Sequence, residues 1–336
     1  MTIVPFCELT EGQEADFFAV FVKKEAKTTS QGKPYYSITI RDANRTVTFP
    51  VWNDSPFTPL IEKLEDNSFI KVRGVYQVNA KYGAQVELIK MRPVQDGDRQ
   101  SGFDEKMFVA QSQFDPEETY ADILAMLKQT IGESDPLYTL CETIFTENKE
   151  KLLSLSAASH NHHAFVGGWL EHTRNVLYNA VMMAKRYTEI YPELSPSLDV
   201  GLVAAGAALH DIGKLEEIAF AGVGFEYTVE GNLIGHMLQG RDIVRDACIK
   251  LGFSGQRYTL LEHVIIAHQR LPEWGAPKPP MIPEALLVHY ADDVDAKFAI
   301  MYNLEKEIAP GKFSPSKNTM GYKVFRPEEE EMGNRE

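Results

Sequence analysis

The stretch ALHDIGK, residues 208–214, follows a run of small apolar residues that begins after Asp199. It places an imidazole and a carboxylate side by side at His210 and Asp211, with the ammonium group of Lys214 one turn later. Residues three and four apart are neighbours on a helix, so the three side chains share one face. An imidazole and a carboxylate suit a divalent metal, and a fixed ammonium group suits a phosphate oxygen. The stretch therefore predicts a helix that carries a metal phosphoesterase site into a bundle; taken alone, it is also compatible with a surface turn.

The histidines of the chain are confined to residues 160–289. Histidine clustered with aspartate is the sequence pattern of a metal site. His172 falls on the helical stripe of Trp169 and Val176 and faces inward, where a satisfied core residue is the alternative to a ligand. His236 begins another predicted helix. The full set is His160, His162, His163, His172, His210, His236, His263, His268 and His289.

Two of these histidines, His263 and His268, share one predicted helix. They are five residues apart, which is about 140° around the axis, so only one is well placed for a common metal. His268 lies on the apolar stripe of Leu261 and Val264 and is the favoured ligand. His263 is the alternative ligand; otherwise it is expected to contact the metal-binding residues without binding the metal itself.

The last long helical stretch, residues 284–302, carries Asp292 on a stripe of small apolar residues. A carboxylate on such a stripe is costly unless it is paired or bound to a metal. Asp292 is therefore the best single carboxylate ligand. Asp293 and Asp295 are expected to face solvent or to cap.

Composition and charge restrict the class of protein. The 336 residues have ordinary apolar and charged fractions, and there is no apolar run of transmembrane length. The N-terminus lacks a signal-peptide pattern, and the three cysteines are widely spaced, which predicts a cytoplasmic protein with reduced thiols and no membrane partner. Residues 16–93 hold 12 Lys and Arg against 8 Asp and Glu, a charge of +4, whereas the remaining 22 and 40 give −18. The small basic surplus lies in one segment.

That basic segment reads as strands. The stretches rich in aromatic and β-branched residues are 15–24, 34–42, 46–52, 69–78 and 84–90, with a short helix at 59–66. Three strands, a helix and two strands is the order of a five-stranded OB-fold barrel, which binds single strands by stacking bases on aromatics in a basic groove. Strand alternation sends about half of the aromatics into the core instead. The candidate substrate contacts are Tyr35, Tyr36, Trp52, Arg41, Arg73 and Lys81.

The sequence therefore predicts a multidomain α and β protein in which an OB-fold barrel precedes an all-α bundle. The barrel is expected over residues 1–94 and a linker, marked by the DGDRQSG run, over 95–117. Helical periodicity then predicts the bundle over 118–310. The acidic stretch 311–336 is expected to be a disordered tail.

The candidate ligands together resemble those of the HD-domain metallohydrolases, helical bundles around one or two divalent ions. More narrowly, an OB-fold followed by HHAFVGGWLEHT at 162–173, HDIGK at 210–214 and PEALLVHYADDVDAK at 283–297 resembles the YhaM-type 3′-to-5′ exoribonucleases. The resemblance covers roughly residues 15–310. One departure is Gln269, where a second histidine is expected after His268.

This resemblance implies removal of 5′-mononucleotides from the 3′ end of single-stranded RNA, with single-stranded DNA as a second candidate substrate. It also implies two ions bridged by Asp211 that activate water, with Mn²⁺ favoured over Mg²⁺, Fe²⁺ or Co²⁺. Lys214 would stabilise charge on the phosphate, and an oligomer is compatible with the sequence. His162 and His163 would contact the phosphate or the terminal nucleotide, unless they only cap a helix entrance. One ion would be held by His172, His210 and Asp211, and the second by His236, His268 and Asp292.

Three other functions use the same residues. A small-nucleotide phosphohydrolase, acting on a cyclic dinucleotide, an alarmone or a dNTP, shares the ligands but has no need of a strand-binding barrel. A non-catalytic nucleic-acid-binding protein would be expected to lose ligands, and here the His and Asp set is complete. A di-iron oxygenase can be built on the same arrangement, and the barrel is the only argument against it.

Overall fold

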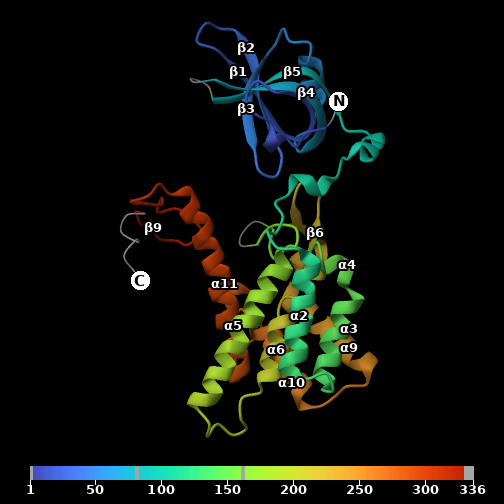
Figure 1. The fold of residues 1–336 in the computed structure, drawn as a ribbon, viewed down its shortest axis with the longest axis vertical. Coiled ribbons are helices and arrows are strands. Elements are labelled where there is room, and N and C mark those ends of the chain that lie inside the picture. Colours follow the sequence, from blue (N-terminus) through green and yellow to red (C-terminus); the bar gives the residue numbers. More distant parts are fainter. Residues whose placement is uncertain (1–2, 80–82, 160–162, 329–336) are drawn as a thin grey trace. The chain divides into compact units, whose positions relative to one another are not determined.

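The computed structural model describes residues 3–79, 83–159 and 163–328 (Figure 1). The chain divides into two compact units. One comprises residues 1–110 with 220–224, and the other comprises residues 111–219 with 225–336. The predicted boundary at 94 thus falls inside the first unit, and each unit is described by itself.

The first unit is built on five strands. Its elements are β1 (Glu14–Thr28), β2 (Pro34–Arg41), β3 (Thr46–Trp52), α1 (Thr58–Lys63), β4 (Ser68–Asn79) and β5 (Gly83–Pro93), with short 3-10 helices at Phe6–Glu8, Asp96–Ser101 and Glu105–Phe108. The strands are antiparallel in the order β3-β2-β1-β4-β5, and β3 also lies against β5. This is the partly open, five-stranded barrel of an OB-fold, as the sequence predicts.

The barrel closes around side chains that alternate along its strands. Phe17, Phe21, Ile38 and Ile40 are fully buried, because every second residue of a strand points inward. The register shifts between Arg73 and Gly74, where the strands approach closely. A Cβ on Gly74 would lie 2.7 Å from the carbonyl oxygen of Glu87, so only glycine fits this bulge.

The predicted linker is structured over its first half. Phe103 and Phe108 are buried and pack with Phe18 of β1, which extends the first unit past the last strand. Asp98 anchors this segment. Its buried carboxylate accepts two hydrogen bonds of 2.7 Å from Arg92 and one of 3.1 Å from Lys71. Apolar anchors and a buried ion pair, rather than chain composition, therefore set the end of the unit.

The second unit is mainly helical. Its elements are α2 (Pro116–Ile131), α3 (Pro136–Glu147), α4 (Lys149–Leu152), α5 (Gly168–Ile190), α6 (Val200–Leu209), α7 (Lys214–Glu217), β6 (Ile218–Phe220), β7 (Phe225–Tyr227), α8 (Val229–Leu233), α9 (His236–Leu251), α10 (Gln256–Ala267), a 3-10 turn (Pro272–Trp274), α11 (Pro283–Glu307), β8 (Lys312–Phe313) and β9 (Phe325–Arg326).

Helix α6 runs through the centre of this bundle. It contacts α2, α3, α5, α10 and α11, and all of its residues from 202 to 209 are buried. Small side chains permit this close packing. A Cβ on Gly206 would lie 2.6 Å from a methyl carbon of Val264 in α10. The alanine and glycine content of α6 thus lets several helices converge on its C-terminal end.

The C-terminal stretch differs from the expected disordered tail. Strands β8 and β9 pair in antiparallel fashion, with the rings of Phe313 and Phe325 4.8 Å apart. The buried hydroxyl of Ser314 accepts a hydrogen bond of 2.9 Å from the amide of Val324. Aromatic packing and backbone pairing thus order residues 311–328 despite their polar composition. Across the described ranges, no helix combines the length and apolar character needed to cross a bilayer.

Asp98→Asn should lower the free energy of unfolding by about 2 kcal/mol, because it leaves Arg92 and Lys71 without their carboxylate. Arg92 is the main cause that holds the pKa of Asp98 well below its usual range, against the opposing effect of burial. A lowered folded-state pKa stabilises above the ordinary carboxyl pKa of about 4, and this stabilisation is lost as the pH falls below it.

Urea unfolding of wild type, Asp98→Asn and the exposed control Asp96→Asn at about pH 7 and about pH 3 tests this. The gap between wild type and Asp98→Asn should narrow at the lower pH. A gap that stays constant would contradict the assignment.

Candidate metal centre

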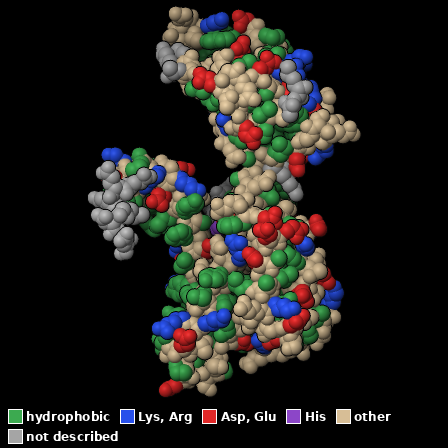
Figure 2. All heavy atoms as spheres, viewed as in Figure 1, with side chains coloured by type: hydrophobic (Ala, Val, Ile, Leu, Met, Phe, Trp, Pro, Cys, Tyr) green, Lys and Arg blue, Asp and Glu red, His purple; other side chains and the backbone are tan. Residues whose placement is uncertain are grey.

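Five segments of the helical unit bring the predicted ligands to one buried place. His210 directly follows the last residue of α6 and His268 that of α10, whereas His236 is the first residue of α9. His172 lies in α5, and Asp292 lies in α11. Both helix-end histidines are fully buried, and Figure 2 shows little histidine surface on the face drawn.

The side chains form two groups around Asp211. In the first group, His172 Nε2 lies 3.3 Å from His210 Nε2, 3.2 Å from Asp292 Oδ1 and 3.7 Å from Asp211 Oδ2. In the second group, Asp211 Oδ1 lies 3.4 Å from His236 Nε2 and 3.6 Å from His268 Nε2. The two carboxylate oxygens of Asp211 therefore face different groups.

Each of the four histidines is held through its other ring nitrogen. Nδ1 of His210 lies 2.7 Å from the carbonyl oxygen of Ala207, and Nδ1 of His268 lies 2.7 Å from that of Ile265. Carbonyl and ionised carboxyl oxygens only accept hydrogen bonds, so these Nδ1 atoms carry the proton.

Carboxylate side chains hold the ring nitrogens Nδ1 of the other two histidines, His172 and His236. Nδ1 of His172 lies 2.7 Å from Asp295 Oδ2, and Nδ1 of His236 lies 2.8 Å from Glu217 Oε1. Such outer contacts orient metal-binding histidines and fix their tautomer. All four Nε2 atoms are thereby directed at Asp211 and Asp292.

This arrangement fits divalent metal. With the proton on Nδ1, a neutral histidine presents a lone pair at Nε2, yet His172 and His210 bring these atoms to 3.3 Å, and His236 and His268 to 3.4 Å. Such pairs need a proton or a cation between them. In addition, the buried Oδ1 of Asp211 accepts no hydrogen bond from the described residues. Together with the donor set, these features suggest divalent metal binding.

Charged neighbours keep Asp211 in the ionised form that can bind a metal ion. Burial opposes the charged form of Asp211, but Lys214 and the surrounding histidines hold its pKa well below the usual range. Burial likewise opposes the charge on His172, yet Asp292 and Asp295 raise its pKa to about 10. Burial instead lowers the pKa of His210 to about 4. Asp211 is thus ionised at neutral pH, and His172 would exchange a proton for a cation.

Lys214 is tethered beside the centre. Its Nζ lies 2.7 Å from Asp211 Oδ2 and donates a hydrogen bond to the carbonyl oxygen of Ala157. The side chain is buried. The ammonium group therefore sits next to the first group, as the spacing in ALHDIGK predicts.

The structure departs from the sequence analysis at several positions. Asp292 lies with His172 and His210, not with His236 and His268. His263 Nε2 accepts a hydrogen bond of 2.9 Å from the amide of Met281, which ties a loop to α10. Gln269 is beside His268, with Nε2 atoms 3.4 Å apart.

The expectation for Asp295 is wrong. This residue does not face solvent, because Oδ2 also lies 3.0 Å from His163 Nε2 and Oδ1 accepts a hydrogen bond from Asn175. Its spacing of three residues from Asp292 puts both on one helix face and could have revealed it. The sequence analysis also did not predict the contact of Glu217 with His236, and the residues around Glu217 show no pattern that would have indicated it. His162 lies outside the described residues.

The barrel residues that were predicted to contact single-stranded nucleic acid fall into two sets. Tyr35 and Trp52 are paired across β2 and β3 with ring centroids 5.4 Å apart, and Lys33 Nζ lies 5.0 Å from the Trp52 ring. Others are engaged within their unit: Tyr36 donates to Glu62, Arg73 pairs with Asp16, and Arg41 donates to the carbonyl oxygens of Phe108 and Val223. Lys81 lies outside the described residues.

Residues 169–297 match the family model of the HD domain. This matched segment carries the two groups of His and Asp side chains described above. Its similarity to the 3′-5′ exoribonuclease YhaM of Oceanobacillus iheyensis is 29% identity over 94% of both chains. The YhaM of Geobacillus sp. strain WCH70 is 29% identical over 90% of this chain and 88% of that protein. The predicted resemblance to YhaM-type proteins is confirmed.

Solved structures overlap with parts of the chain. The second OB-fold domain of replication protein A from Methanococcus maripaludis covers 28% of this chain and 97% of its own, at 13% identity and a TM-score of 0.23. The match to asparaginyl-tRNA synthetase from Pyrococcus horikoshii covers 48% of this chain and 38% of the synthetase chain, at 16% identity and a TM-score of 0.22. The OB-fold assignment rests on the strand order described above.

Asp295→Asn should weaken divalent-metal binding by about tenfold to a hundredfold, because the amide cannot hold the His172 ring as the carboxylate does. Glu217→Gln should do the same through His236. Titration of the metal-free protein with Mn²⁺ measures both affinities. Asp293→Asn is the control, since Asp293 pairs only with the exposed Lys297 among the described residues. Unchanged affinity in Asp295→Asn would refute the positioning role.

Proposed function

We propose that the chain is a metal-dependent 3′-to-5′ exonuclease that releases 5′-mononucleotides from single-stranded RNA, with single-stranded DNA as a second substrate. The carrying observation is the position of Asp211, whose two oxygens face two separate His groups. This is the arrangement expected of a carboxylate that bridges two ions. Mn²⁺ is the proposed ion, and Mg²⁺, Fe²⁺ and Co²⁺ can take the same donors.

The chain's own residues have distinct tasks in this proposal. His172, His210 and Asp292 would hold one ion and His236 and His268 the other, with Asp211 shared. Bound divalent ions would lower the pKa of a water molecule toward neutrality and polarise the scissile phosphate. Lys214 would keep Asp211 in place and add positive charge beside the phosphate oxygens. Asp295 orients His172 and contacts His163, which places His163 next to the centre.

The barrel would hold the strand. Tyr35 and Trp52 form an aromatic pair beside Lys33, the combination that stacks bases and attracts phosphates. On the face of the barrel that Figure 2 draws, lysines and arginines are interspersed with acidic residues. A small-nucleotide hydrolase has no need of this barrel, and the similarity to the exoribonucleases named YhaM runs across both units.

The test is incubation of the purified protein with Mn²⁺ and 5′-labelled single-stranded RNA, with products resolved by length. A ladder that shortens from the 3′ end is expected. Asp211→Asn should abolish it, because the amide removes the charge that would bind metal; the variant should be less stable, since the buried Lys214 loses its carboxylate partner, but its circular dichroism spectrum should remain that of the folded protein. Asp293→Asn should retain full activity. An intact strand with metal bound, or turnover by Asp211→Asn, would contradict the proposal.

Lys214→Ala should cut turnover by about a hundredfold, the usual effect of losing one donor to a developing phosphate charge. Metal content should remain at the wild-type level. The exposed Lys297→Ala serves as the control. Loss of metal together with activity would give Lys214 a structural role only.

A further inference from the structure

Four cationic side chains share the outer face of the barrel where β4 and β5 pair. The register of the two strands sets them opposite one another in two pairs, Lys71 with Arg92 and Arg73 with Lys90. Successive residues of a strand point to opposite faces, and the intervening Val72 and Met91 belong to the buried core of the barrel. The four cations therefore point outward together, and we call this surface the cationic face.

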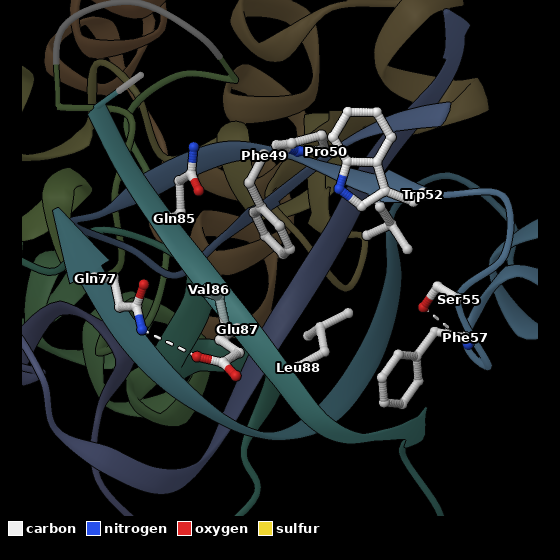
Figure 3. Close-up of a pocket in the computed structure, with 11 residues that line it drawn as sticks. Phe49, Pro50, Trp52, Ser55, Phe57, Gln77, Gln85, Val86, Glu87 and Leu88 are labelled. Carbon is white, nitrogen blue, oxygen red and sulfur yellow. Dashed lines mark hydrogen bonds between the residues drawn. The ribbon is translucent and has the colours of Figure 1, made fainter. Parts of the chain in front are cut away.

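A depression of about 450 Å³ lies among these side chains. All four cations line it, and so do Asp16 of β1 and the exposed Ile89. The depression differs from the cavity between β3 and β5 (Figure 3), whose described lining residues include no lysine or arginine. It also differs from the aromatic pair of Tyr35 and Trp52, which lies on β2 and β3. The barrel thus has a second concave surface, and this one is cationic.

Two carboxylates hold the cations in place from the inside. Asp98 bonds to both Lys71 and Arg92, so these two side chains converge on one point. The side chain of Asp98 is only 5% exposed, whereas that of Arg92 is 39% exposed. Asp16 accepts hydrogen bonds of 2.7 Å and 2.8 Å from Arg73. Four cations against two carboxylates leave a charge of +2, and the cations are the more exposed partners.

The cationic face keeps hydrogen-bond donors for an anion. A guanidinium group has five N–H donors, and Asp16 takes two of those of Arg73. Lys90 has three donors and is exposed, and no carboxylate of the described ranges forms an ion pair with it. Guanidinium and ammonium groups fixed in this way match the oxygens of a phosphate.

We propose that the cationic face binds two neighbouring phosphates of the single-stranded RNA substrate. The inference rests on the proposed function and adds a phosphate-binding surface on β4 and β5 to the aromatic pair on β2 and β3. The two cation pairs are two residues apart along the strands, or about 6.6 Å. Each pair can therefore take its own phosphate, which a strand supplies and a single inorganic phosphate does not.

The experiment measures the affinity of full-length protein for a labelled single-stranded RNA of about twelve nucleotides over a range of salt concentrations. The Asp211→Asn background prevents degradation during the measurement. Adding Lys90→Gln should weaken binding about fivefold at about 0.1 M salt, and should reduce the slope of log K against log salt by about 0.7, the value for one lost phosphate contact on a single strand. Lys90→Glu should weaken binding further.

Three controls separate this effect from others. Lys63→Gln and Lys63→Glu change an exposed lysine of α1 outside the face and should leave affinity and slope unchanged. Trp52→Ala should weaken binding with little change in slope, because stacking releases few counterions. The melting temperature of the Lys90 variants should equal that of their parent, since Lys90 makes no ion pair with the described residues.

Equal affinities and slopes for Lys90→Glu and Lys63→Glu would overturn the inference. So would a Lys90→Glu variant that binds ATP more weakly but RNA as well as its parent does, because the face would then belong to a small polyphosphate.

The two proposals fail separately. RNA degradation by the wild-type protein together with unchanged RNA binding in Lys90→Glu would reject only the cationic face. RNA binding that weakens in Lys90→Glu, with no degradation by the wild-type protein, would reject only the exonuclease.

Discussion

The buried carboxylate of Asp211 is the charge around which the helical unit is arranged. Lys214 compensates one of its oxygens, and four imidazole rings are directed at the pair of carboxylates that it forms with Asp292. An uncompensated buried charge is among the most costly defects in a protein interior. The surrounding helices must therefore deliver their polar groups accurately, and the small residues of α6 make this convergence sterically feasible.

Sequence patterns revealed the two kinds of unit because each has its own periodicity. Alternating β-branched and aromatic residues gave the strand order, and the apolar stripes gave the helix faces that carry His172, His268 and Asp292. These patterns could not predict which metal-binding side chains lie together in each of the two groups around Asp211. That partition depends on how α11 packs on α5 and α6, which is a tertiary property. Asp292 was accordingly assigned to the wrong group.

The other differences have equally local causes. Asp295 lies beside the apolar stripe that carries Asp292 and not on it, so the stripe did not reveal its contact with His172, and Glu217 reaches His236 only because α7 and α9 fold together. The end of the first unit was placed too early because the polar DGDRQSG run reads as a linker. Its Asp98 in fact satisfies two cations of the barrel. Short segments ordered by a few long-range contacts carry little signal in a single sequence.

The helix-end histidines have a second consequence. His210 and His268 each satisfy a carbonyl group in the last turn of the helix that they follow. Such carbonyls lack intrahelical partners, and a buried one left unpaired costs about 1–3 kcal/mol. Both residues are thus useful to the fold with or without a metal. A relative that had abandoned catalysis would therefore keep His210 and His268 for stability, so the presence of these two histidines does not by itself mark an active enzyme.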